Sequence, residues 1–342
     1  MTRTAAPETL FAVTPFAEQD SDRIDRFGEA QLLRFVREWL GDSCPPCPRG
    51  IGDDVAVLPP GGDGERFLLT NDSLVWGRHF DETAGPGAAG RKLLKRNLSD
   101  IAAMGGRPAH AVLGLCCGGD VSLAWLTRFF TGLGAEAVRW NCEINGGDLA
   151  QSGDGTFAAT LALLGRCGHP VPRNGGETDS WIWVTGSLGG SILGHHLDFE
   201  PRLAEGRWLS EGGETLAMMD LTDGLAHDLP EMVPPGLQAR LDLAFVPISD
   251  GARASAQDSG KPAVWHAFTD GEDYELAFVT RAGIDPTRFE ARWRERFPGT
   301  PLAPVGTFVT APPTNGSTPP KVAGLDGQAL FGGAGFEHFR DG

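Results

Sequence analysis

Apolar residues recur along the chain with two periods, one that fits a helix and one that fits a strand. The helical period predicts helices over residues 28–40, 91–104, 123–141 and 285–297. Short apolar runs bounded by Gly, Pro and Asp predict strands at 55–58, 67–69, 109–116, 157–164, 181–184 and 276–279. Strands and helices that alternate in this way indicate an α/β or α+β fold.

The chain has 342 residues, which is long for a single hydrophobic core, so we expect two domains. The segment G-R-C-G-H-P-V-P-R-N-G-G at 165–176 is rich in Gly and Pro and is the candidate linker. We therefore expect an irregular extension at 1–25, an N-terminal domain at 26–168 and a C-terminal domain at 169–342.

The net charge of −16 argues against a nucleic acid or an anionic membrane as partner, because such a field repels polyphosphates. A nucleotide can still bind an acidic site through metal ions that reverse the local sign. The first residues are broken by Pro and polar side chains, and no run approaches 18 apolar residues. We expect a cytoplasmic protein.

Carboxylates set among glycines and other small residues recur throughout the chain. The motifs are G-I-G-D-D (50–54), T-N-D-S (70–73), N-L-S-D (97–100), N-G-G-D (145–148), D-L-T-D-G (220–224) and D-G-E-D-Y-E (270–275). We expect them on turns at element ends, where they can converge. Two carboxylates about 5 Å apart repel by roughly 3 kcal/mol at an effective dielectric of 20, so a cluster must protonate or hold cations. Magnesium suits such oxygen ligands and a phosphorylated substrate.

Each motif also has a simpler interpretation. A single Gly-Asp pair is common in turns, and N-L-S-D could lie inside a helix, although Asn, Ser and Asp are poor helix formers. The basic residues Arg91, Lys92, Lys95 and Arg96 are expected on a solvated helix face. Arg173 is the better phosphate candidate, because the glycines around it let backbone and guanidinium approach together.

Other patterns carry less chemistry. Cys44-Pro-Pro-Cys47 has redox spacing but no second pair that would complete a zinc site. G-S-L-G-G-S at 186–191 does not fit a dinucleotide fingerprint and predicts a tight turn into a helix, and a Walker A motif is absent. His195 and His196 have no ligand partner at metal-binding spacing and are expected to be surface or structural residues.

Taken in order, the motifs resemble those of the thiamine-monophosphate kinases, within the superfamily of aminoimidazole ribonucleotide synthetase and selenophosphate synthetase. The resemblance runs from about Gly28 to Phe339. It rests on G-I-G-D-D-V-A-V-L, L-L-T-N-D-S-L-V-W-G-R-H-F, N-L-S-D-I-A-A-M-G-G-R-P, N-G-G-D, F-E-P-R-L, M-D-L-T-D-G-L-A-H-D-L, D-G-E-D-Y-E-L-A-F and G-F-E-H-F.

The resemblance implies a two-domain aminoimidazole ribonucleotide synthetase-like fold, whose N-terminal sheet pairs across a homodimer and whose C-terminal domain is α/β. It implies a phosphotransferase that moves the γ-phosphoryl group of ATP to thiamine monophosphate with several Mg²⁺ ions. The implied metal residues are Asp54, Thr70, Asn71, Asp72, Asp100, Asp148, Asp220 and Asp223, of which Asp72, Asp148 and Asp223 are the implied catalytic residues. Gly147, Asp148, Arg173 and Thr222 would contact ATP, and His79, Glu272 and Phe331 would contact the thiamine compound.

The chain departs from the family pattern at several positions. Asn71 stands where the family usually has Thr, Leu149-Ala150-Gln151 follow N-G-G-D, and Asp270 replaces a Gly. Gly333 stands where an aromatic is common, so Phe331 or Phe336 would cover the thiazolium ring. Two alternatives stay open: a related ATP-dependent enzyme with another acceptor, and a non-catalytic nucleotide- or metal-binding homologue.

Overall fold

The structure is a computed structural model that describes residues 29–41, 44–62, 64–313 and 319–331. The chain divides into two units, one formed by residues 1–44 with 337–342 and the other by residues 45–336. The described part of the first unit is dominated by helix α1 (Glu29–Leu40), which agrees with the helix predicted at 28–40. Everything that follows concerns the second unit.

The first sheet of this unit has five strands in the order β1-β2-β5-β3-β4. Its strands are β1 (Ala56–Pro60), β2 (Arg66–Val75), β3 (Arg107–Gly118), β4 (Glu143–Ser152) and β5 (Phe157–Cys167). β4 runs parallel to β3, and all the other neighbours are antiparallel. β4 is therefore an edge strand, and every one of its first nine residues is exposed.

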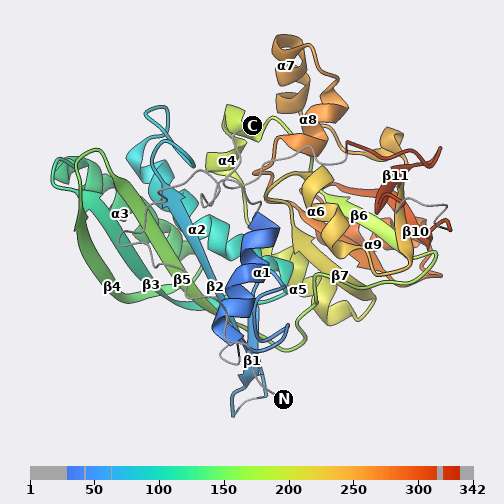
Figure 1. The fold of residues 1–342 in the computed structure, drawn as a ribbon, viewed down its shortest axis with the longest axis horizontal. Helices are drawn as coiled ribbons and strands as arrows, with labels where there is room; N and C mark the ends of the chain where they lie inside the picture. The colour runs from blue at the N-terminus through green and yellow to red at the C-terminus, as the bar shows by residue number, and fades with distance from the viewer. Residues whose placement is uncertain (1–28, 42–43, 63, 314–318, 332–342) are drawn as a thin grey trace, which may run out of the picture. The chain divides into compact units, whose positions relative to one another are not determined.

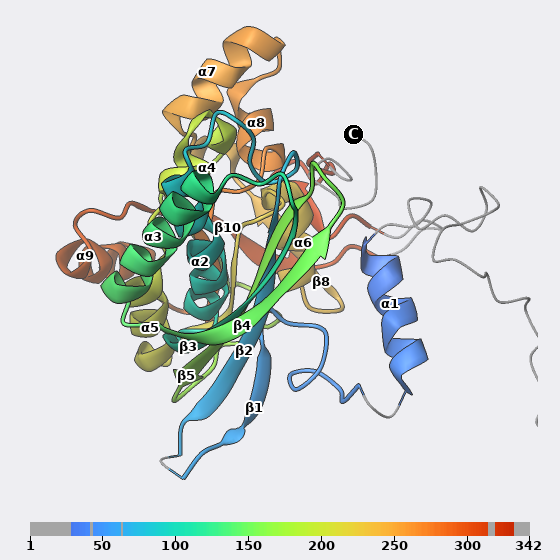
Figure 2. The same ribbon diagram turned by 90° about the vertical axis from the view of Figure 1, so that its left-hand side faces the viewer.

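Two helices, α2 (Pro86–Ala103) and α3 (Leu123–Arg139), cover one face of the first sheet (Figure 2). α2 begins five residues earlier than the apolar pattern predicted, because Pro86 is placed at the first turn, where its missing N–H costs no hydrogen bond. In β5 buried and half-buried side chains alternate strictly, as expected for a strand with only one face against the helices.

The second sheet has six strands in the order β11-β8-β10-β6-β9-β7. Its strands are β6 (Trp181–Thr185), β7 (Thr215–Asp220), β8 (Leu237–Leu241), β9 (Leu276–Thr280), β10 (Leu302–Thr310) and β11 (Val322–Gly324). The helices of this half are α4 (His195–Asp198), α5 (Leu203–Gly212), α6 (Leu225–Met232), α7 (Asp250–Ser259), α8 (Ala263–Thr269) and α9 (Pro286–Arg296). The mixed α/β fold with two sheets confirms the predicted fold class.

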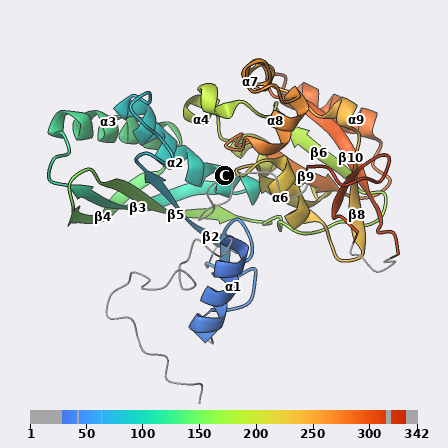
Figure 3. The ribbon, with the colours of Figure 1, turned by 45° about the horizontal axis from the view of Figure 1, so that its top comes forward.

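Helix α2 joins the two halves of the unit (Figures 1 and 3). It packs on β2 and β5 of the first sheet and also against α4, α5 and β7. A Cβ at Gly206 of α5 would lie 2.0 Å from the carbonyl oxygen of Ala102, so glycine lets the two helix backbones approach. Along the described residues, no helix is long and apolar enough to cross a membrane.

The sequence predicted that the acidic motifs lie on turns, and for three of them this was wrong. T-N-D-S is inside β2, N-L-S-D is inside α2, and N-G-G-D is inside β4. β4 had not been predicted, because an exposed edge strand rich in glycine shows no alternation of apolar residues. The turn at 186–191 was predicted to lead into a helix. It leads only to a 3₁₀ segment, Ser191–Leu193, and to the four-residue α4.

Candidate active site

Four aspartates from separate elements gather beside α2. Asp54 precedes β1, Asp72 lies in β2, Asp100 lies in α2, and Asp220 ends β7. The pKa of Asp100 is raised by burial and then by the negative charges of Asp72, Asp220 and Asp54, which places the four carboxylates within electrostatic reach of one another. We call Asp54, Asp72, Asp100 and Asp220 the carboxylate cluster.

The weak helix formers of N-L-S-D hold this cluster in place. Ser99 Oγ donates to Asp220 Oδ2 at 2.5 Å, and the backbone N–H of Asp72 donates to Asn97 Oδ1 at 3.1 Å. Thr70 Oγ1 donates to Asp100 Oδ2. Polar residues on the inner side of α2 therefore tie its C-terminal end to β2 and β7.

The cluster is short of positive charge. Burial, followed by neighbouring carboxylates, raises the pKa values of Asp100 and Asp220 well above the ordinary range. Burial raises the pKa of Asp54 to about 6, against the opposing effect of a neighbouring guanidinium. Asp54 Oδ2 is buried, and no described residue hydrogen-bonds to it. Oxygen ligands in such surplus fit a hard divalent cation.

Arg173 provides a cation at one side of the cluster. Its Nε donates to Asp54 Oδ1 at 3.1 Å, and its backbone N–H donates to both carboxylate oxygens of Asp53 at 3.1 and 3.2 Å. The residue lies in the segment between the two sheets, so this pair fixes the G-D-D loop to the start of the second half. The guanidinium stands where a nucleotide phosphate could replace a carboxylate as its partner.

The T-D-G loop after β7 is held by a carboxylate that sequence reasoning missed. Asp228 Oδ2 accepts from the backbone N–H groups of Thr222 and Asp223 at 2.9 and 3.0 Å. Asp228 also contributes to the raised pKa of Asp220, and it groups with Asp223 and His227 within 4.8 Å. The signal was present in the sequence as a second aspartate five residues after Asp223.

A second group of residues lies beside the N-terminal half of α2. Lys92 Nζ donates to Glu272 Oε2 at 2.8 Å and to the carbonyl oxygen of His79 at 2.8 Å. Lys92 thus connects two of the residues expected to contact the thiamine compound. His79 Nδ1 in turn pairs with the backbone N–H of Val75 at 3.0 Å.

Glu272 is held in a strained loop. Its φ is +54°, and that of Tyr274 is +51°, values that non-glycine residues rarely adopt. The backbone N–H of Glu272 donates to Thr222 O at 2.6 Å, and that of Tyr274 donates to Leu221 O at 2.8 Å. The D-G-E-D-Y-E and D-L-T-D-G motifs are therefore packed against each other.

The prediction of a solvated basic face on α2 was wrong. Lys92 and Lys95 are buried, and the Arg96 side chain is only 11% exposed. Lys95 Nζ donates to the carbonyls of Leu197 and Phe199 at 2.9 and 2.6 Å. The cause is the position of α2 between the two sheets, which the periodicity of the helix alone does not reveal.

Two further predicted ligands point away from the cluster. Along β2 the side chains alternate, so exposed Asn71 projects from the face opposite to Thr70 and Asp72. Asp148 pairs in register with Gly114, in the row that continues through Thr160 to Ser73, which is the same face as Asn71. Three strand spacings separate β4 from β2, or about 14 Å, so within one chain Asp148 does not reach Asp72.

The remaining predicted positions lie elsewhere. A Cβ at Gly147 would lie 1.7 Å from the carbonyl oxygen of Leu113, so close pairing of β4 with β3 already requires glycine there. Phe331 packs on Phe268 with ring centroids 4.9 Å apart. Gly333 and Phe336 lie outside the described residues.

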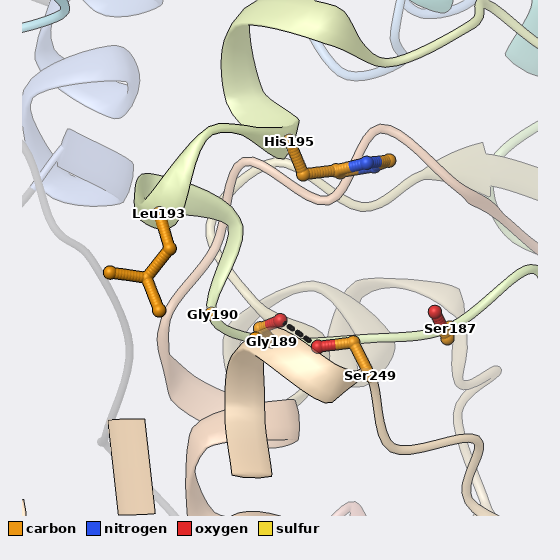
Figure 4. Close-up of a pocket in the computed structure, with 7 residues that line it drawn as sticks. Ser187, Gly189, Gly190, Leu193, His195 and Ser249 are labelled. Atoms are coloured by element: carbon orange, nitrogen blue, oxygen red, sulfur yellow. Dashed lines mark hydrogen bonds between the residues drawn. The ribbon is translucent and has the colours of Figure 1, made fainter. Parts of the chain in front are cut away.

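The turn at 186–191 forms a pocket of its own. A cavity of about 280 Å³ is lined by Ser187, Gly189, Gly190, Leu193, His195, Ser249 and Gly251 (Figure 4). None of the predicted site residues lines it. Behind it, Asp270 Oδ2 accepts from Gly190 N at 2.7 Å, and its carboxylate also pairs with His266 Nδ1, so the aspartate that departs from the family pattern anchors this turn.

His195 and His196 have structural roles, as expected. His195 Nε2 lies 3.0 Å from the carbonyl oxygen of Asp273, and His196 Nδ1 lies 2.8 Å from that of Ser191. Asp273 itself accepts from Gly189 N and Ser191 Oγ, and burial raises its pKa to about 8. These contacts hold Asp273, the residue after Glu272, against the turn at 186–191.

Comparison with known proteins identifies the family of the chain. Residues 52–167 match the domain family described as AIR synthase related protein, N-terminal domain. The chain is 35% identical over 258 residues to the thiamine-monophosphate kinase of Rhodopirellula baltica, covering 73% of this chain and 81% of that protein. It is 33% identical over 276 residues to the thiamine-monophosphate kinase of Escherichia coli, covering 74% and 82%.

Solved structures share the fold. AaThiL complexed with AMPPCP and TMP superposes with a TM-score of 0.76 at 24% identity, over 92% of this chain and 98% of the other. The thiamine-monophosphate kinase of Stenotrophomonas maltophilia gives a TM-score of 0.66 at 27% identity, over 89% and 97%. The identity and coverage of the curated relatives decide the assignment: this chain belongs to the thiamine-monophosphate kinase family.

Proposed function

We propose that this chain transfers the γ-phosphoryl group of ATP to thiamine monophosphate and forms thiamine diphosphate and ADP. The observation that carries the proposal is the placement of two groups on one helix. The carboxylate cluster lies at the C-terminal end of α2, and Lys92 with His79 and Glu272 lies toward the N-terminal end. The relatives that carry this name support the choice of acceptor.

The reaction requires little proton chemistry. The second pKa of a phosphate monoester is about 6, so the acceptor is already largely a dianion at neutral pH. One of its oxygens attacks the γ-phosphorus of ATP, the bond from that phosphorus to the β,γ-bridging oxygen breaks, and ADP leaves with the electron pair. The protein must position two anions in line and reduce their repulsion.

The carboxylate cluster would hold Mg²⁺, which supplies positive charge that neutralises the phosphate oxygens during the transfer. Asp54, Asp72, Asp100 and Asp220 are the candidate ligands, with Asp223 at the edge of the site. Thr70 positions the carboxylate of Asp100 through its hydroxyl group. Arg173 and Thr222 would contact ATP, since Arg173 donates to Asp54 and Thr222 lies two residues after Asp220.

A homodimer would explain the location of Asn71, Gly147 and Asp148. All three belong to strands of the first sheet, and exposed apolar side chains such as Leu69 and Val112 share the face of Asn71 and Asp148. A second copy packed on this face would bury those side chains and bring Asp148 of the partner subunit toward Asn71. Light scattering at micromolar concentration should give the dimer mass, and a monomer would contradict the proposal.

A turnover assay tests the function directly. The purified protein is incubated with ATP, Mg²⁺ and thiamine monophosphate, and thiamine diphosphate is separated by chromatography. We expect product that depends on all three components. ATP consumption with a different phosphorylated acceptor would indicate a related enzyme, and nucleotide binding without product would indicate a non-catalytic homologue.

A further inference from the structure

Arg96 lies between the two groups that the proposed function assigns to metal and to acceptor. Lys92, Arg96 and Asp100 are spaced by four residues, so they form one stripe along α2. With a rise of 1.5 Å per residue, Arg96 is about 6 Å along the axis from each of the others. The stripe therefore runs from the His79–Glu272 group through a guanidinium to the carboxylate cluster.

The guanidinium is only partly satisfied in the structure. Arg96 Nη1 donates to the carbonyl oxygen of Ser73 at 2.6 Å, which fixes the direction of the side chain. Its Nε is 3.4 Å from Asp72 Oδ2, but the geometry is not that of a hydrogen bond. Nε is buried, and none of the described residues accepts a hydrogen bond from it. A buried, charged donor without an acceptor is costly and indicates that the acceptor belongs to a ligand.

Arg96 and Lys92 are two cations on one stripe, and carboxylates lie on both sides of them. Asp72, Glu272 and Asp100 all act on the charge of Arg96. In an in-line transfer the acceptor phosphate must lie between the metal-bound γ-phosphoryl group and the organic part of the acceptor. Arg96 occupies that intermediate position.

We propose that Arg96 is a binding residue for the phosphate of the acceptor, donating from Nε to a phosphate oxygen. This inference rests on the proposed function. The guanidinium would neutralise part of the negative charge of the acceptor phosphate and would leave the lone pair of another phosphate oxygen available for attack. The contact of Arg96 with Asp72 would keep the Arg96 side chain directed toward the carboxylate cluster.

The test compares ligands with and without the phosphate. Calorimetry measures binding of thiamine monophosphate and of thiamine, in the presence of Mg²⁺, to the wild-type protein and to Arg96→Gln. We expect Arg96→Gln to bind thiamine monophosphate about 10- to 100-fold more weakly, the factor for one charge-assisted hydrogen bond. Its affinity for thiamine should change less than about twofold by the same reasoning, because thiamine has no phosphate.

Two further variants control for charge and folding. Arg91→Gln makes the same charge change on the same helix, five residues away, and should bind both ligands like the wild type. Arg96→Lys keeps the charge but loses the planar fork, so its affinity for the monophosphate should be intermediate. Thermal unfolding of every variant checks that the fold is intact.

The outcomes separate this inference from the proposed function. A wild-type protein that does not prefer thiamine monophosphate over thiamine would overturn both. A normal preference in the wild type that persists in Arg96→Gln would overturn the role of Arg96 alone. An equal loss of affinity for both ligands would show that Arg96 only supports the fold.

Discussion

Two groups of buried carboxylates in this molecule differ in how their charge is balanced. In the carboxylate cluster, burial, followed by neighbouring carboxylates, raises the pKa values of Asp100 and Asp220, and Asp54 keeps a buried oxygen to which no described residue donates a hydrogen bond. Glu275, in the second half, accepts from Arg202 Nε at 2.7 Å, from Arg202 Nη2 at 2.5 Å and from Thr185 Oγ1 at 2.6 Å. The first group has more carboxylates than the cations beside it, Arg173 and Arg96, can balance and is suited to a ligand, whereas Glu275 is already satisfied and serves the fold.

The largest effect should follow from removing a carboxylate of the cluster. We expect Asp100→Asn to reduce turnover roughly a thousandfold, because neutralisation by a metal ion is worth several kcal/mol of the barrier. The free energy of unfolding without Mg²⁺, measured in urea at pH 8, should be unchanged or higher, because one mutually repelling charge is gone. Equal turnover in the variant and the wild type would contradict a metal-binding cluster.

The opposite result is expected for the balanced group. Glu275→Gln leaves the guanidinium of Arg202, which is only 15% exposed, with the more distant carboxylate of Glu205 at 4.0 Å, and this should destabilise the fold by about 3 kcal/mol. Urea unfolding measures the change. Glu211→Gln is the matched control, since Glu211 pairs with Arg207 in an exposed salt bridge, and should cost less than about 1 kcal/mol. Similar losses in the two variants would remove the distinction between the groups.

The sequence predicted the fold class and most long elements, and it missed how the charged residues are buried. The apolar period placed α3 and α9 to within two residues, since those helices each bury one stripe. It could not show that Lys92 and Lys95 are buried, because their partners are backbone carbonyls and Glu272, which lies 180 residues away. β4 was missed because its side chains are exposed on both faces.

The sequence predicted only part of the site, because it shows local motifs and does not show which residues pack together. Asp54, Asp72, Asp100 and Asp220 were found because each carries its acidic signature locally, and the structure brings them together. Asp228 and Arg96 were not among the predicted candidates, since their contacts with the T-D-G loop and with Asp72 appear only in the folded chain. Local motifs therefore identify candidate ligands, while the packing of α2 between two sheets decides which of them meet.

Magnesium and pH should act together on the cluster. The folded-state pKa values of Asp54, Asp100 and Asp220 are raised, so without metal these groups reduce stability as the pH rises from about 4, where unfolded aspartate titrates, through their folded-state values. Mg²⁺ binds the deprotonated carboxylates and should offset this loss. We expect Mg²⁺ at 100 times its Kd to stabilise the protein at pH 8 by about 2.7 kcal/mol per site.

The same addition at pH 5 should have a much smaller effect, because the protons then occupy the carboxylates. Thermal unfolding with Mg²⁺ or with EDTA at the two pH values measures the difference. Asp100→Asn is the control and should lose most of the stabilisation at pH 8. A shift in Tm that is equal at both pH values would argue that the metal binds elsewhere.

The last prediction concerns Lys95, a buried cation that belongs to neither group of carboxylates. Burial lowers the pKa of Lys95 to about 8, from an ordinary value of 10.5. Below pH 8 both the folded and the unfolded protein carry the proton, so the penalty for burying the charge is present in full. Between pH 8 and 10.5 the unfolded chain binds more protons than the folded one, and stability contributed by this residue therefore rises with pH. Its full extent is at most about 3.4 kcal/mol by the conversion of 1.36 kcal/mol per pH unit over about 2.5 units.

Lys95→Met has no amine to titrate, and it also loses the hydrogen bonds to Leu197 and Phe199. We expect the variant to be less stable than the wild type at high pH and the gap to narrow as the pH falls from 10.5 to 8. Urea unfolding of both proteins across this pH range measures the gap between their free energies of unfolding. Groups that titrate equally in both proteins contribute nothing to this gap. Lys261→Met, at an exposed lysine over Trp265, should follow the wild type throughout. A gap that does not change with pH would mean that Lys95 stays charged in the fold, where the carboxylates of Glu136 and Asp198 act on its charge.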